Sequence, residues 1–150
     1  MTASDRAYEE RRHADSVAAL CALLAQRDGL WRTDEDVAAA TERARGLLAP
    51  GTTADPGQLQ QALRELDEAL LRAGDPRGLG GALRVGAGSV PGIGSRPDVP
   101  GVRPMIKVAL CPGTAPCTRR EPAKDLWPAP PCALNGVRMR KERLRRDPTA

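Results

Sequence analysis

Three cysteines near the C-terminus are the residues whose chemistry and spacing first suggest a site. Cys111, Cys117 and Cys132 follow the pattern C-x5-C-x14-C. Clustered thiolates are typical ligands of structural zinc, with about two to four residues between paired ligands. The first pair is wider than that, and Asn135 stands where a ribbon-like knuckle would place a second thiolate after Cys132. The pattern therefore indicates at most a degenerate zinc-ribbon-like segment.

Three interpretations of these cysteines stay open. They are reduced thiols in a loop-rich segment, or they bind zinc with a further ligand, or two of them form a disulfide, for instance Cys111 with Cys117. Three thiolates make a poor closed zinc site, so the missing ligand would come from His13, Cys21 or a second chain. A disulfide is disfavoured in a reducing cytosol. We expect no cofactor, with zinc at Cys111, Cys117 and Cys132 as the alternative.

Catalytic chemistry has little support in the residue types. The chain has one histidine, His13, which lies far from the three cysteines in sequence. No Asn or Asp stands in a recognisable third role beside a thiol and an imidazole. We predict that the protein is not an enzyme and has no catalytic residues.

A run of cations close to the C-terminus is the second candidate site. It consists of Arg138, Arg140, Lys141, Arg143, Arg145 and Arg146. Such a run neutralises phosphates without reading base sequence, but no aromatic residues interleave with it to stack on bases. Three interpretations remain: a solvated tail that contacts the acidic half of the chain, a nucleic-acid contact, or a contact with an acidic protein.

The two halves of the chain differ in charge and composition. Residues 1–72 carry 9 basic and 13 acidic side chains with 6 Gly and Pro, whereas residues 73–150 carry 14 and 6 with 23 Gly and Pro. The first composition is typical of a folded domain and the second of a disordered one. Aromatic residues make up 2% of the chain and Phe is absent, so any core is built from Leu, Val and Ala.

Caps and hydrophobic periodicity predict three helices in the first half. The first opens at Thr2 or Ser4, the second at Thr33, and the third at Asp55 with Pro56 at its first helical position. The predicted apolar stripes are Val17, Leu20, Cys21 and Leu24; Val37, Ala40, Ala44, Leu47 and Leu48; and Leu59, Leu63, Leu66 and Leu70. Because the connections are short, we predict a small three-helix bundle over residues 1–73. Trp31, in the first turn between helices, either caps this bundle or contacts another protein.

The second half is predicted to be mostly irregular. Residues 74–104 have no helical or strand period and are expected to be a disordered Gly/Pro-rich linker. Residues 105–137 are expected to form the small irregular Cys-containing segment, with a strand at 105–110 and at most a short hairpin about Asn135-Gly136. Residues 138–150 form the basic tail. The predicted fold class is therefore mainly α.

No apolar run approaches the about 20 residues that a membrane span needs, and no signal-peptide pattern is present. We expect a cytoplasmic protein without a membrane partner.

Several short stretches carry a resemblance to a known family. They are Gly29-Leu30-Trp31, Gln61-Ala62-Leu63-Arg64-Glu65-Leu66, Leu83-Arg84-Val85-Gly86-Ala87 and Val99-Pro100-Gly101-Val102-Arg103. Their order over residues 16–103 resembles the CATRA-associated small proteins, which are encoded beside caspase-containing conflict systems of actinobacteria. The glycine-rich insert and the cysteine segment depart from that pattern. The resemblance implies a non-enzymatic partner in an immune-like effector assembly, with no catalytic residues to transfer.

We therefore predict a non-enzymatic protein–protein interaction or adaptor module, an accessory component of a bacterial conflict system, that binds a protein partner or itself through residues 1–73. The alternative is a nucleic-acid-associated protein that uses a small metal-binding or degenerate ribbon and the basic tail.

Overall fold

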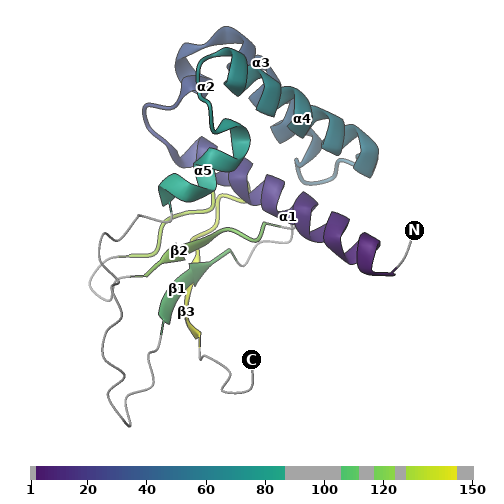
Figure 1. Cartoon of the computed structure of the whole chain (residues 1–150). Helices are drawn as coiled ribbons and strands as arrows, with labels where there is room; N and C mark the ends of the chain where they lie inside the picture. Colours follow the sequence, from purple (N-terminus) through teal and green to yellow (C-terminus); the bar gives the residue numbers. More distant parts are fainter. Residues whose placement is uncertain (1–2, 87–105, 112–116, 124–127, 145–150) are drawn as a thin grey trace.

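The computed structural model of the chain describes residues 3–86, 106–111, 117–123 and 128–144, which form five helices and a small sheet. The helices are α1 (Ala3–Ala25), α2 (Leu30–Thr33), α3 (Glu35–Leu47), α4 (Pro56–Arg72) and α5 (Gly78–Gly86), and the strands are β1 (Ile106–Leu110), β2 (Arg120–Pro122) and β3 (Arg140–Leu144). α3 and α4 form one layer, α1 and α5 a second, and the sheet lies on the far side of α1 and α5 (Figure 1). The mainly helical fold class is confirmed, although the helices number five and not three.

The predicted helix starts are close to the observed ones. α1 begins at Ala3, so Ser4 lies inside it, and Thr2 is outside the described residues. The cap of the second predicted helix lies one residue later than expected. Thr33 ends the one-turn α2, and Asp34 caps α3 by accepting a hydrogen bond from the Val37 amide at 3.0 Å. The predicted third helix corresponds to α4, whose four stripe leucines are all buried.

Helix α5 corrects the predicted linker, because residues 78–86 are helical and lie against α1 and α4. Gly78 opens the helix with φ +56°, a conformation that favours glycine. The Asp67 side chain of α4 then accepts a hydrogen bond from the Leu79 amide at 2.7 Å. Leu79 and Ala82 are buried. The helical part therefore extends to residue 86 and does not end at residue 73.

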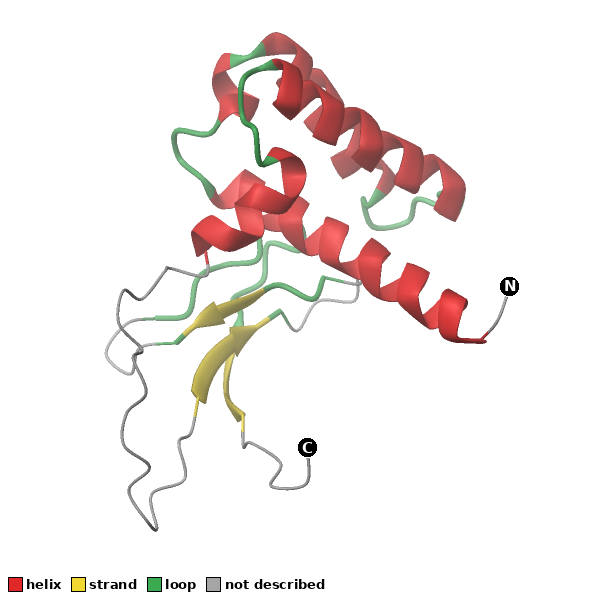
Figure 2. Cartoon of the chain, viewed as in Figure 1, coloured by secondary structure: helices red, strands yellow, loops and turns green. Residues whose placement is uncertain are grey.

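The second half contains a three-stranded antiparallel sheet of order β2-β1-β3 (Figure 2). The predicted strand at 105–110 is present as β1. The expectation of at most a hairpin is wrong, and so is the assignment of residues 140–144 to a tail, because they form β3 and pair with the whole of β1. The turn about Asn135-Gly136 is present, with Gly136 at φ +66° and a bridge between Pro131 and Arg138.

A single core joins the two halves. Ala109, Ala129 and Met139 from the second half are buried in the same cluster as the leucines of α1 and α4. None of the helices that the structure describes is long and apolar enough to cross a membrane.

Candidate functional site

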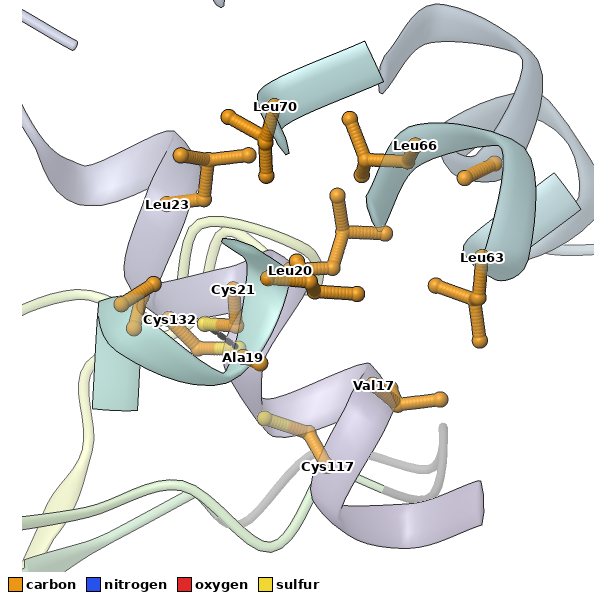
Figure 3. Close-up of a cluster of buried hydrophobic side chains, with 14 of the residues drawn as sticks. Val17, Ala19, Leu20, Cys21, Leu23, Leu63, Leu66, Leu70, Cys117 and Cys132 are labelled. Atoms are coloured by element: carbon orange, nitrogen blue, oxygen red, sulfur yellow. Dashed lines mark hydrogen bonds between the residues drawn. The ribbon is translucent and has the colours of Figure 1, made fainter. Parts of the chain in front are cut away.

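The sulfur atoms of Cys21, Cys117 and Cys132 come together where α1 meets the second half of the chain. The three Sγ atoms lie within 4.8 Å of one another, and those of Cys21 and Cys132 are 3.5 Å apart. Figure 3 shows Cys21 and Cys132 facing each other, with Cys117 against the same helix. None of the four cysteines forms a disulfide in the structure. Two members of the predicted trio, Cys117 and Cys132, therefore lie together with Cys21, and the third, Cys111, contacts Cys132.

Helix packing, a hydrogen-bonded turn and a contact with α1 position the three cysteines. Cys21 lies on the apolar stripe of α1 and is 0% exposed. Cys132 begins the turn about Asn135-Gly136, where its amide donates to the Val137 carbonyl at 2.8 Å and its carbonyl accepts from the Gly136 amide at 2.8 Å. The segment that carries Cys117 is tied to α1 by Thr118, which donates to a carbonyl of that helix at 3.2 Å. These contacts hold the sulfurs together although they are distant in sequence.

Arg119 supplies the positive charge beside the cluster. It is 5% exposed, and its Nη1 donates to the Sγ of Cys21 at 3.4 Å. Its Nη2 forms an ion pair with Glu121, and its Nε is buried without a hydrogen-bond partner. Because a buried cation requires negative partners, this arginine favours negative charge on the neighbouring sulfur.

Asn135 and Cys111 form the outer part of the site. The Nδ2 of Asn135 donates to Cys111 at 3.3 Å and to Cys132 at 3.5 Å. Asn135 therefore does not replace a ligand, as the knuckle pattern suggested, but donates hydrogen bonds to two sulfurs. Cys111 is half-buried at the end of β1 and hydrogen-bonds with Cys132.

The proton distribution in the cluster follows from these contacts. A hydrogen bond from Cys117, together with the hydrogen bond and charge of Arg119, lowers the pKa of Cys21 to about 5 in spite of its burial. The same contact with Cys21, and burial, raise the pKa of Cys117. Burial also raises the pKa of Cys132, and a hydrogen bond with Cys111 adds to the effect. These contacts therefore favour negative charge on Cys21 over negative charge on Cys117 or Cys132.

This arrangement can bind a soft metal ion or form a disulfide, but it is poorly suited to covalent catalysis. A nucleophilic thiolate must be reached by its substrate, and Cys21 and Cys132 are both 0% exposed. His13 lies elsewhere, in a groove of about 400 Å³ between α1 and α4 whose lining includes Arg64 and Asp67 and none of the cysteines.

The other predicted site residues are distributed over the surface. Trp31 is half-buried at the edge of the core, where its Nε1 donates to the Gln26 carbonyl at 3.3 Å and the Arg32 guanidinium lies 4.4 Å from its ring centroid. Of the predicted cationic run, Arg138 donates to the Ala129 carbonyl at 2.9 Å. The remaining described members, Arg140, Lys141 and Arg143, are exposed on β3, and Arg145 and Arg146 lie outside the described residues.

Sequence reasoning named Cys21 only as one possible fourth ligand and missed Arg119. The number of cysteines could have indicated the role of Cys21. The three cysteines of the second half lack a fourth ligand, and the chain has one further cysteine, on the apolar stripe of its first helix.

Comparison with family models found no match, and no curated protein or solved structure is detectably similar to the chain.

Proposed function

We propose that the protein is a non-enzymatic adaptor that binds another protein through its helical part. The observation that carries this proposal is the exposure of the N-terminal half of α1. Every side chain in residues 4–12 is exposed except that of Ala7, and Tyr8 is 63% exposed. A helical segment with little buried surface is only marginally stable in water, so a partner that covers this half of α1 would stabilise it.

The burial of the cysteine cluster supports a non-enzymatic role. Cys21, whose pKa its neighbours lower, has no exposed surface and is already hydrogen-bonded by Arg119. Buried sulfurs of this kind maintain a fold, because a substrate cannot approach them. The resemblance to the CATRA-associated small proteins supplies a setting for the adaptor, as an accessory component of a bacterial conflict system.

Affinity capture with the full-length chain tests this proposal. The tagged wild-type protein is compared with Tyr8→Arg and with Val137→Arg, a matched control because Val137 is 43% exposed on the second half of the chain. Loss of an interface tyrosine weakens binding by at least about 2 kcal/mol when it is a hot spot, or roughly 30-fold. We expect one protein to be retained by wild type and Val137→Arg and lost by Tyr8→Arg, and then to bind purified wild-type chain in calorimetry. Equal retention by Tyr8→Arg would contradict the proposal.

Nucleic-acid binding is a second candidate because of a separate observation. Arg140, Lys141 and Arg143 are exposed on β3, and the strand order puts β3 at an edge of the sheet. Arg140 pairs with Glu142, which offsets part of that charge. If this edge binds phosphates, Arg143→Gln lowers the salt dependence of DNA or RNA binding by about one unit of slope. Arg120→Gln, on the opposite edge strand β2, is the control and should leave the slope unchanged.

A further inference from the structure

The geometry of the sulfur atoms is that of a single tetrahedral metal centre. Zinc–thiolate bonds of about 2.3 Å place the sulfurs of a tetrahedral site roughly 3.8 Å apart. The observed sulfurs are at comparable separations, because those of Cys21 and Cys132 are 3.5 Å apart and all three lie within 4.8 Å of one another. Cys21, Cys117 and Cys132 are therefore close enough together to share one ion after small side-chain adjustments.

The surrounding N–H donors are directed at the sulfur atoms. Arg119 donates to Cys21, and Asn135 donates to both Cys111 and Cys132. N–H groups directed at sulfur are the outer-shell contacts that orient and tune metal-bound thiolates. Cysteines that only fill a core behave as small apolar side chains and need no such donors.

A cation is required for these cysteines to ionise together. Neighbouring thiolates repel one another strongly in a buried environment. Arg119 brings one positive charge, which it shares with Glu121, so it cannot balance three or four thiolates. A divalent ion at the centre removes most of the imbalance, and Arg119 then compensates part of the remaining negative charge.

We propose that Cys21, Cys117, Cys132 and Cys111 bind one Zn²⁺. We assign Cys111 as the fourth ligand because it lies beside Cys132 and shares the Asn135 amide with it. The sulfurs that lie within 4.8 Å of one another are those of the other three cysteines, so the Cys111 side chain must move toward them to complete the site. The thiols lose their protons as the ion binds. The ion joins α1 to the sheet, since one ligand comes from the first helix and three come from the second half of the chain. This zinc site does not depend on whether the helical part binds a partner.

The first test is the metal content of the full-length wild-type chain, purified under reducing conditions. We expect about one zinc ion per chain by elemental analysis and by native mass spectrometry. Replacement of zinc by Co²⁺ should give the intense near-ultraviolet sulfur-to-cobalt absorption and the strong visible bands of a tetrahedral thiolate site. A wild-type chain that binds neither ion, or that carries a disulfide under these conditions, would overturn the proposal without reference to any variant.

Variants then assign the ligands. Cys21→Ser should lower zinc affinity by at least about 100-fold, whereas Ala22→Ser, which also adds a hydroxyl to the buried part of α1 but removes no sulfur, should keep it. Asn135→Ala should lower affinity about 10–100-fold, as other outer-shell changes do. Cys111→Ser should reduce the charge-transfer intensity of the cobalt form. Unchanged cobalt spectra for Cys21→Ser would refute the site, and an unchanged spectrum for Cys111→Ser would refute the fourth ligand.

Discussion

Replacing Gly78 by alanine should destabilise the protein, because this residue lets the chain enter α5. Gly78 has φ +56°, and a Cβ built on it would lie 2.3 Å from Oδ1 of Asp67. The left-handed backbone costs an alanine about 1–2 kcal/mol, and displacing Asp67 from the Leu79 amide removes a hydrogen bond to a charged group, about 1.5–3 kcal/mol. The lower entropy of the unfolded alanine chain offsets about 0.4–1 kcal/mol. We expect the free energy of unfolding to fall by about 2–4 kcal/mol.

Urea unfolding of the full-length chain, followed by far-ultraviolet circular dichroism, measures this change. Gly80→Ala is the matched control in the same helix: it is exposed, and its Cβ would have no heavy atom within 4 Å. This control should raise stability by about 0.5–1 kcal/mol. In an Asp67→Ala background, Gly78→Ala should lose only the backbone cost, about 1 kcal/mol. The reasoning is refuted if Gly78→Ala is as stable as wild type, or if both glycine variants change in the same direction.

Three further substitutions test the packing and caps of the helical part, each by the same unfolding measurement. Leu66→Ala should lower the free energy of unfolding by about 2–5 kcal/mol because Leu66 is 0% exposed at the centre of the core, and a loss under about 1 kcal/mol would contradict the assigned packing. Asp34→Ala should cost about 1 kcal/mol by removing the cap on the Val37 amide, whereas Asp34→Asn should retain most of it. Thr41→Val should change stability by less than about 1 kcal/mol, since the buried hydroxyl donates only to the Val37 carbonyl of its own helix at 2.7 Å; a larger loss would show that the hydroxyl has another role.

The parts of the fold that were predictable are those whose signals are local. The leucines of α4 repeat at helical spacing beside a cap and a proline, so sequence alone located the helix. Helix α5 was not predicted because its glycines oppose helix formation. The contact that stabilises it comes from Asp67 in a different helix. Strand β3 was not predicted for a related reason. Its sequence has no alternation of polar and apolar residues over Arg140, Lys141, Glu142 and Arg143, and it becomes a strand because it pairs with β1.

The same distinction holds for the cysteine cluster. The sequence spacing of Cys111, Cys117 and Cys132 pointed to a degenerate site because one ligand lies outside that part of the chain. Cys21 has the spacing of an ordinary core residue, and nothing near it indicates a partner 111 residues away. The donors Arg119 and Asn135 face sulfurs on different segments, so their roles depend on the completed tertiary structure.

The distance along the chain between Cys21 and Cys132 has a consequence for synthesis. The ribosome makes α1 early, and Cys132 is not added until 111 residues after Cys21, which takes about 5–20 s at ordinary rates of synthesis. During that interval the nascent helix exposes an apolar face and an uncovered thiol, so this face is open to oxidation and to wrong pairing with other nascent chains. Truncated products that end before residue 132 keep that surface permanently and should be recognised by chaperones and proteases.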